Sequence, residues 1–157
     1  MVRAIVLFVA ALLPAFWASA GEIDSFLQSR EVAAQIYFKK SAWQLTQENQ
    51  KSLQRIAKEL LRAQGAGQLI RVEGFASPEG TTMQNFNLSL QRASAVKDFL
   101  LQQGVKTELF LSGYGENNLS TVKLSEQRRV DVAVYQVNRT IKQLFQKSGK
   151  VERFVIQ

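Results

Sequence analysis

The sequence contains no histidine and no cysteine among its 157 residues. Without an imidazole or a thiol, the chain lacks the commonest general base, a cysteine nucleophile, and the usual ligands of zinc, haem and iron–sulfur sites. Disulfides and lipid attachment through a cysteine are excluded for the same reason. No motif of a serine–lysine or paired-carboxylate enzyme is present, so we expect no enzymatic activity, no metal and no other cofactor.

The chain also lacks an apolar run long enough for an ordinary membrane anchor. An apolar run over residues 4–16 follows Arg3 and precedes Ala18-Ser19-Ala20, which is the layout of a secretory signal peptide. This run has about 13 residues, whereas a helix needs roughly 20 to span a bilayer, so an uncleaved anchor is the weaker interpretation. We expect cleavage after Ala20 and a mature chain in the periplasm without a direct membrane anchor. A peripheral position at the outer membrane is compatible with this.

The charge of the mature chain is moderately basic. Removing residues 1–20, which carry one cation and no anion, lowers the formal net charge from +7 to +6. A basic chain suits nucleic acid, anionic lipid or an anionic wall polymer. Export argues against nucleic acid, and the basic residues are scattered without interleaved aromatic residues, so we expect no nucleic-acid partner.

Hydrophobic periodicity divides the mature chain into alternating strands and helices. The expected strands cover residues 36–38, 69–75, 109–112 and 129–135, and the expected helices cover 47–63 and 83–102. Thr46 is the expected N-cap of the first helix. Helical crossovers favour parallel strands with the helices packed on one face, so we predict an α/β fold. The last strand alternates cleanly and should be an inner strand, in either direction.

The expected organisation is a signal peptide over 1–20, a short N-terminal segment over 21–35, one domain over 36–136 and a C-terminal extension over 137–157. Residues 138–147 in this extension have helical spacing. Phe154-Val155-Ile156 could form a terminal strand or a docking segment.

Arg92 is unusual because it places a permanent cation on the apolar side of the second expected helix. Asn85, Leu88, Arg92, Val96 and Phe99 follow one another at spacings of 3, 4, 4 and 3, so they share the side that should face the core. A guanidinium there needs an anionic or multiply accepting partner, either in the protein or on a ligand. The turn before this helix lies close enough to form the rest of such a site.

Arg92 also belongs to an ordered set of short motifs that runs from residue 36 to residue 135. The set comprises Ile36-Tyr37-Phe38, Leu45, Leu53, Val72-Glu73-Gly74, Gly80, Asn85, Leu88-Ser89, Arg92-Ala93, Val96, Gly113-Tyr114-Gly115-Glu116 and Arg128-Arg129-Val130. Together these motifs resemble the OmpA-like peptidoglycan-associated domain, found in outer-membrane protein A, peptidoglycan-associated lipoproteins and flagellar stators. The resemblance implies an OmpA-like two-layer α/β sandwich with a mixed sheet and helices on one face, which holds the diaminopimelate residue of the peptidoglycan stem peptide.

The resemblance also implies roles for Arg92 and for the turn before its helix. Diaminopimelate presents an ammonium and a carboxylate on one carbon, so a binder needs an anion and a cation a few ångströms apart. Arg92 matches the carboxylate-binding arginine of the family. The anion of the family is an aspartate, and the equivalent position here is Ser77. A hydroxyl can accept a hydrogen bond from an ammonium but lacks the Coulomb attraction of a carboxylate.

Three interpretations of Ser77 remain open. Glu79 could supply the missing carboxylate from a turn stiffened by Pro78, and this variant Ala-Ser-Pro-Glu-Gly site is the working hypothesis. Alternatively, the site binds a different stem peptide or none, and Arg92 is an internal strut that caps loop carbonyls. The third interpretation is that the turn is misaligned with the family.

Three further candidates each have a local alternative. Asn85 could orient the ligand backbone or satisfy amide groups near the helix start. By resemblance Arg129 lies near the pocket, although a pair with Glu116 or Asp131 is favoured. Phe75 could line the pocket wall or fill core beneath the turn.

We therefore expect a non-covalent peptidoglycan-binding module that anchors a protein partner or envelope complex to the cell wall. The short segment over 21–35 is too small to link wall and membrane, so an envelope protein should supply the second attachment, with residues 137–157 as its candidate contact. The alternative is an OmpA-fold component of a secretion, conjugation or motility machine that has lost peptidoglycan binding. The neutral Ser77 favours that alternative.

Overall fold

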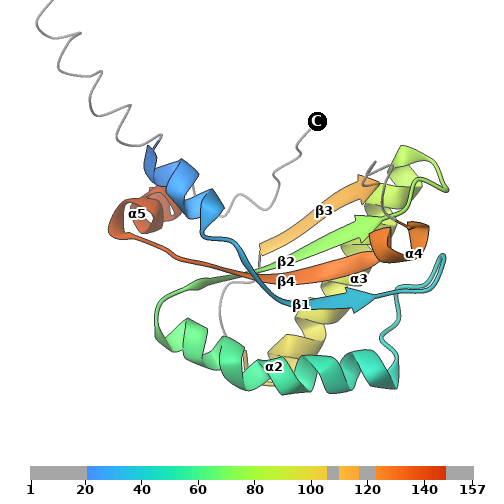
Figure 1. Ribbon diagram of the computed structural model, residues 1–157, viewed down its shortest axis with the longest axis horizontal. Helices are drawn as coiled ribbons and strands as arrows, with labels where there is room; N and C mark the ends of the chain where they lie inside the picture. Colours follow the sequence, from blue (N-terminus) through green and yellow to red (C-terminus); the bar gives the residue numbers. More distant parts are fainter. Residues whose placement is uncertain (1–20, 106–109, 117–122, 148–157) are drawn as a thin grey trace, which may run out of the picture.

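A four-stranded mixed sheet is the framework of the computed structural model, which describes residues 21–105, 110–116 and 123–147. Its strands lie in the order β1-β4-β2-β3 (Figure 1). The elements along the chain are β1 (Glu31–Tyr37), α2 (Gln47–Gly65), β2 (Leu69–Ala76), α3 (Thr82–Gln102), β3 (Phe110–Glu116), α4 (Leu124–Gln127), β4 (Arg129–Tyr135) and α5 (Arg139–Lys147). Residues 21–28 form a further helical segment before β1.

The predicted α/β fold with a mixed sheet is confirmed. β2 and β3 pair in parallel, as the helical crossover between them predicts. β4 is an inner strand, as expected, and it is antiparallel to both β1 and β2. β1 and β2 therefore point the same way but are separated by β4.

Two predicted strand boundaries differ from the structure, whereas those of α2, α3, β2 and β4 agree to within two residues. The first strand begins at Glu31, because residues without an apolar pattern pair with the end of β4. The expected end of the third strand at residue 112 is wrong, since β3 continues through Glu116. Its Gly113 pairs with Gly74 of β2, and such pairing overrides the local turn preference of glycine.

Two predicted features lie outside the described residues, namely the signal peptide over 1–20 and the apolar segment over 154–156. Within the described ranges, none of the helices combines the length and apolar character that crossing a membrane requires.

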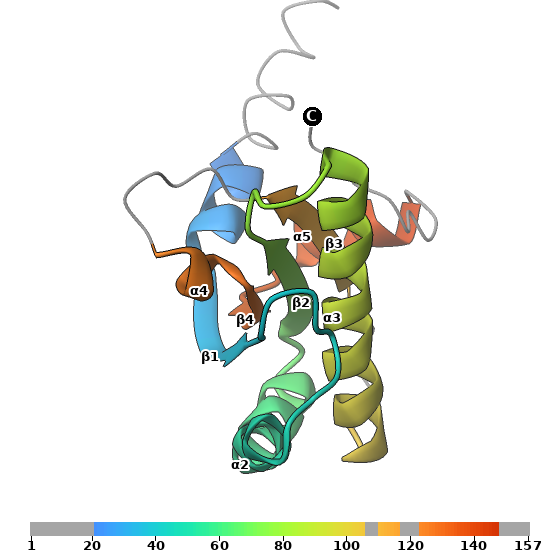
Figure 2. The ribbon, with the colours of Figure 1, turned by 90° about the vertical axis from the view of Figure 1, so that its right-hand side faces the viewer.

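Packing of α2 and α3 on one face of the sheet forms the main core (Figures 1 and 2). Alternate residues of the inner strands point to this face, which is why the valines of β4 read as a period of two. The fully buried apolar side chains of this core are Leu53, Leu60, Ile70, Val72, Ala93, Val96, Leu100, Val105, Val130 and Val132. Burial of each such leucine, isoleucine or valine side chain contributes about 1.5–3 kcal/mol relative to its exposed state.

Both core helices begin at capped residues. The Thr46 side chain accepts a hydrogen bond from the backbone N–H of Asn49, which confirms Thr46 as the N-cap of α2. α3 begins with a reciprocal capping box between Thr81 and Gln84. The box fixes the point at which the turn after β2 becomes helix.

α3 lies unusually close to β2 at Gly74. A Cβ atom at Gly74 would meet the backbone oxygen of Ser89 at 2.0 Å and the Ala93 side chain at 3.2 Å. Small residues on α3 permit this approach, so its buried face includes Ser89 and Ala93 and is rotated slightly from the predicted one. This close approach fixes the position of Arg92 relative to the end of β2.

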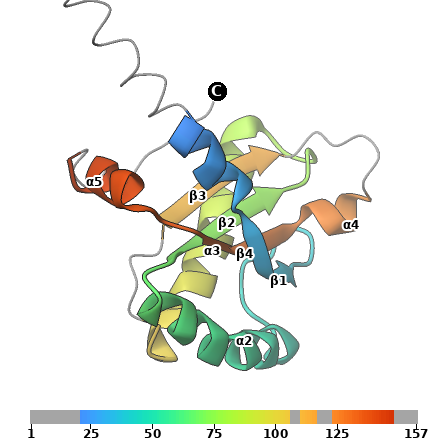
Figure 3. The same cartoon turned by 60° about the vertical axis from the view of Figure 1, so that its left-hand side comes forward.

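The other face of the sheet carries a smaller apolar cluster. Phe26 stacks on Tyr135 with ring centroids 5.0 Å apart, and Ile141 of α5 joins them. The Thr140 hydroxyl donates to the Glu22 carboxylate at 3.0 Å, so residues 21–28 and α5 lie side by side (Figure 3). The prediction of helices on one face therefore holds for α2 and α3, while these two segments cover part of the opposite face.

We predict that Gly74→Ala lowers the free energy of unfolding by about 3 kcal/mol or more, because two backbones would have to separate. The matched control is Gly65→Ala at the end of α2, where a Cβ atom would meet nothing within 4 Å. There alanine should be neutral or stabilise by up to about 1 kcal/mol. Chemical denaturation of the three forms checks this, and equal stability of both variants would contradict it.

Candidate functional site

Three connecting segments meet at the end of the sheet where β1 and β2 finish and β4 begins (Figures 1 and 3). They are the loop over 38–46, the turn over 77–81, and α4 with the residue that follows it. The Phe38 N–H donates to the Arg128 carbonyl at 2.8 Å, which ties the first segment to the third. We call these segments the loop cluster.

Arg92 holds the loop cluster together from below. Its side chain is fully buried, and its Nε donates to the Ala42 carbonyl at 2.9 Å. Its Nη1 and Nη2 donate to the carbonyls of Phe75 and Lys39, each at 3.1 Å. Its guanidinium carbon also lies 5.3 Å from the centroid of the Phe38 ring. The multiply accepting partner that the sequence requires is thus the backbone of β2 and of the first loop.

Burial and the nearby Arg128 charge lower the pKa of Arg92 to about 10. Arg92 therefore remains a cation at neutral pH, and its charge is compensated by carbonyl dipoles. Because the side chain has no exposed surface, a ligand can contact it only if the overlying loop moves. This geometry matches the internal-strut interpretation of Arg92.

Glu79 lies back over Ser77 and carries the negative charge of the cluster. The Ser77 hydroxyl, which is buried, donates to Glu79 Oε2 at 2.8 Å. Arg128 Nη1 also contacts Oε2, at 3.1 Å, while Lys40 Nζ contacts Oε1 at 2.9 Å. Ser77 and Glu79 are therefore joined by a direct hydrogen bond.

The Glu79 carboxylate is stabilised in its charged form. Hydrogen bonds from Lys40 and then Ser77 hold the pKa of Glu79 below its ordinary value of 4.5, and the Arg128 charge adds to this. One carboxylate faces two cations at the surface, with Arg92 beneath them, so the cluster has a positive surplus. Such a surface attracts anionic groups.

Asn85 has a local role in the structure. Its Nδ2 donates to the Gly80 carbonyl at 3.3 Å, and the side chain is buried. A Cβ atom at Gly80 would lie 2.9 Å from Asn85 Oδ1, so this position leaves little room for a side chain. Asn85 thereby fixes the turn that presents Glu79.

Phe75 and Arg129 lie together on the face of the sheet opposite α2 and α3. The Arg129 guanidinium carbon is 4.5 Å from the centroid of the Phe75 ring. Arg129 Nε donates to Asp131 Oδ1 at 2.9 Å, which is the favoured pairing, and Nη1 donates to the Glu126 carbonyl. Phe75 is half-buried there and does not belong to the main core.

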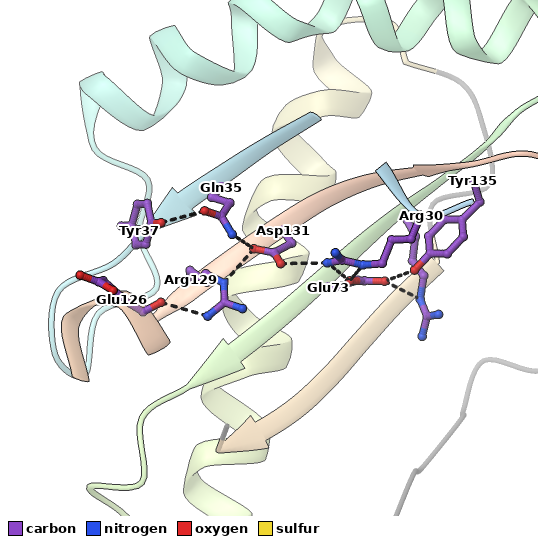
Figure 4. Close-up of polar contacts among 9 residues, drawn as sticks. Arg30, Gln35, Tyr37, Glu73, Glu126, Arg129, Asp131 and Tyr135 are labelled. Carbon is purple, nitrogen blue, oxygen red and sulfur yellow. Dashed lines mark hydrogen bonds and ion pairs between the residues drawn. The ribbon is translucent and has the colours of Figure 1, made fainter. Parts of the chain in front are cut away.

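A chain of ion pairs runs from Arg129 along this outer face (Figure 4). Asp131 is shared between Arg129 and Arg30, and Arg30 Nη2 also contacts Glu73 Oε2 at 2.8 Å. The Tyr135 hydroxyl donates to Glu73 Oε1 at 2.7 Å. Both carboxylates are only 2% exposed, so their partners are essential to their burial. The network fastens the segment before β1 to the sheet and orients Arg129.

Surface hollows are found away from the loop cluster. Two surface hollows, with volumes of about 260 and 320 Å³, lie at the opposite end of the sheet, one beside the end of α2 and one between residues 21–29 and α5. Among the described residues, no group of acidic side chains is arranged to hold a metal ion.

Lys40 and Arg128 are the two site residues that sequence reasoning missed. Lys40 lies in a loop without periodicity, and Arg128 precedes a strand, where a pair with nearby residues is the simplest expectation. The one usable signal was Glu79, since a carboxylate beside a neutral Ser77 in a basic chain should attract a cation.

The fold and this cluster define a two-layer α/β domain with a charged loop surface at one end of its sheet. The family model described as the OmpA family matches residues 37–131, and the chain belongs to that family.

Individual relatives agree with this assignment. The peptidoglycan-associated lipoprotein of Pseudomonas aeruginosa is 31% identical over 126 residues, which cover 74% of this chain and 73% of that protein. The structure of the peptidoglycan-associated lipoprotein from Burkholderia pseudomallei matches with a TM-score of 0.57 and 25% identity, over 65% of this chain and 89% of that chain. The C-terminal domain of Helicobacter pylori MotB matches in fold, with a TM-score of 0.58 and 21% identity, over 71% of this chain and 91% of that chain.

We predict that Arg92→Lys lowers the free energy of unfolding by about 2–4 kcal/mol, because a single ammonium cannot reach three carbonyls spread over a loop and a strand. Arg92→Met should cost at least as much. Denaturation measures the loss. Relative to the wild type, amide hydrogen exchange in the variants should speed up more in residues 38–46 than in α2. Native stability of both variants would contradict the strut geometry.

A second prediction concerns alkaline pH. Burial and the bond to Glu73 raise the pKa of Tyr135 to about 12, from 10.0. Since the folded pKa exceeds the unfolded one, the stabilisation is complete below pH 10 and is lost as pH rises towards 12. The stability advantage of the wild type over Tyr135→Phe should shrink across this window. A difference in unfolding free energy between the two forms that stays constant from pH 9 to 12 would contradict this prediction.

Proposed function

We propose that this chain is a non-covalent peptidoglycan-binding module of the periplasm that attaches an envelope protein to the cell wall. Membership of the OmpA family supports a role in the envelope, and the two relatives from Pseudomonas aeruginosa and Burkholderia pseudomallei are named peptidoglycan-associated lipoproteins. The ligand is the diaminopimelate residue of the stem peptide, and the loop cluster is its site. The function is attachment without chemical turnover.

The contact between Ser77 and Glu79 is the observation that carries this proposal. The family aspartate is absent at Ser77, yet the Ser77 hydroxyl lies 2.8 Å from the Glu79 carboxylate. A longer side chain two residues later thus returns a negative charge to the neighbourhood of the missing one. Its lowered pKa keeps it charged at neutral pH, as an ammonium-binding group must be.

The ligand carboxylate has two candidate cations. Arg128 is at the surface, and its Nε is buried without a hydrogen-bond partner among the described residues. Arg92 lies beneath, contributes positive charge, and can touch the ligand only after the 39–42 segment moves. Asn85 supports the turn from α3, while Phe75 of β2 and Arg129 of β4 lie beside the site on the outer face of the sheet.

The end of the molecule away from the loop cluster suits the protein partner. Residues 21–28 and α5 lie there, and the side chains of Ile23 and Leu27 are 43% and 53% exposed. Residues i and i+4 of a helix share one side, so Ile23 and Leu27 form a small exposed apolar patch beside α5. A partner bound at this end would leave the loop cluster free for the wall.

The alternative function is an OmpA-fold interaction component of a secretion, conjugation or motility machine without wall binding. Two observations favour it. Arg92 is fully buried with its nitrogens on backbone carbonyls, and Glu79 already faces two cations. In that case the contacts of the loop cluster only stabilise the fold.

Calorimetry with a diaminopimelate-containing stem peptide separates these functions. We predict that the wild type binds and that Glu79→Gln weakens binding by about 1–3 kcal/mol, since a neutral amide loses the charge-assisted contact. The matched control is Glu59→Gln on the exposed side of α2, which should bind as the wild type does. Absence of binding heat for the wild type, together with no retention on purified sacculi, would contradict the proposal and support the alternative.

A further inference from the structure

We infer that Lys40 is an internal stand-in for the ligand ammonium, so that the loop cluster is closed by its own side chain until a ligand displaces it. This inference rests on the proposed function and adds to it a residue that sets which ligands can bind. Ligands that carry an ammonium should enter by exchange with Lys40, and ligands without one should not.

The two oxygens of Glu79 are held in different ways. Oε2 is bound from the protein side by the Ser77 hydroxyl and by Arg128 Nη1. Oε1 is bound by Lys40 Nζ at 2.9 Å. An alkylammonium group of a ligand has the same charge and the same three donors as Nζ, so it can replace Lys40 at Oε1 without rearranging Oε2.

Lys40 is also the easier partner to remove. Its side chain is 66% exposed, whereas that of Arg128 is 16% exposed. An exposed ion pair on a flexible side chain shifts an equilibrium by only about one- to fivefold. Release of Lys40 therefore hinders a ligand slightly, while its presence keeps the Glu79 charge paired when no ligand is bound.

In the free protein the place proposed for the ligand ammonium is filled by a side chain, since Lys40 Nζ lies 2.9 Å from Glu79 Oε1. The two hydrogen bonds on Oε2 keep the carboxylate oriented while its other partner exchanges. The site is thus preorganised on one oxygen and exchangeable on the other.

The contact is tested first without ligand, through the Glu79 carboxyl titration followed by NMR. Lys40→Met should raise the pKa of Glu79 towards 4.5, because the lysine makes the largest contribution to lowering it. Lys58→Met, which removes an exposed cation from α2, should leave it unchanged. An unshifted Glu79 titration in Lys40→Met overturns the inference.

The exchange is then tested by calorimetry on the same three forms with the diaminopimelate stem peptide. Lys40→Met should bind the peptide about two- to fivefold more tightly, since no competitor has to leave, and Lys58→Met should match the wild type. A peptide whose diaminopimelate amine is acetylated should lose binding to all three forms, because it cannot occupy Oε1.

The outcomes separate this inference from the proposed function. If the wild type binds but Lys40→Met binds more weakly or equally, Lys40 contacts the ligand or is irrelevant, and only the inference falls. If none of the three forms binds the peptide, both fall together. Circular dichroism of Lys40→Met confirms that a changed affinity does not reflect a changed fold.

Discussion

The buried guanidinium of Arg92 is the interaction on which the end of this molecule depends. It joins α3, the end of β2 and the loop after β1 by donating to the carbonyls of Phe75, Lys39 and Ala42. Its position relative to the sheet is set by the close approach of α3 to Gly74. Without it, the loop that carries Lys40 and the turn that carries Glu79 would not be held at a fixed separation. One cation below the surface thus positions an ion-pair cluster above it.

Much of this fold could be predicted from the sequence, because its inner strands and core helices follow simple periods. β4 agrees with the alternating pattern of valines, and α2 begins after its predicted N-cap, Thr46. The boundaries of β1 and β3 could not be predicted in this way, since their ends are fixed by pairing with other strands rather than by local preference.

The candidate site could be predicted only in part. The unusual place of Arg92 and the neutral Ser77 could both be recognised in the sequence, and so could the closeness of Glu79 to Ser77. The partners of these residues could not, because Lys40 and Arg128 are 39 and 49 residues from Glu79 along the chain. Contacts between loops carry no periodic signal, and the fold alone brings them together. For the same reason the sequence did not distinguish a ligand-binding arginine from a strut.

The positions of residues 21–28 and α5 have a mechanical consequence. Both lie at the end of the sheet away from the loop cluster, and they continue into β1 and β4, which are antiparallel neighbours. A load applied between these two segments would peel β1 from β4 one hydrogen bond at a time. A load between the loop cluster and either segment would run along the strands, so that the ladder bonds share it in shear. As a wall attachment, the domain would therefore be loaded in its stronger direction.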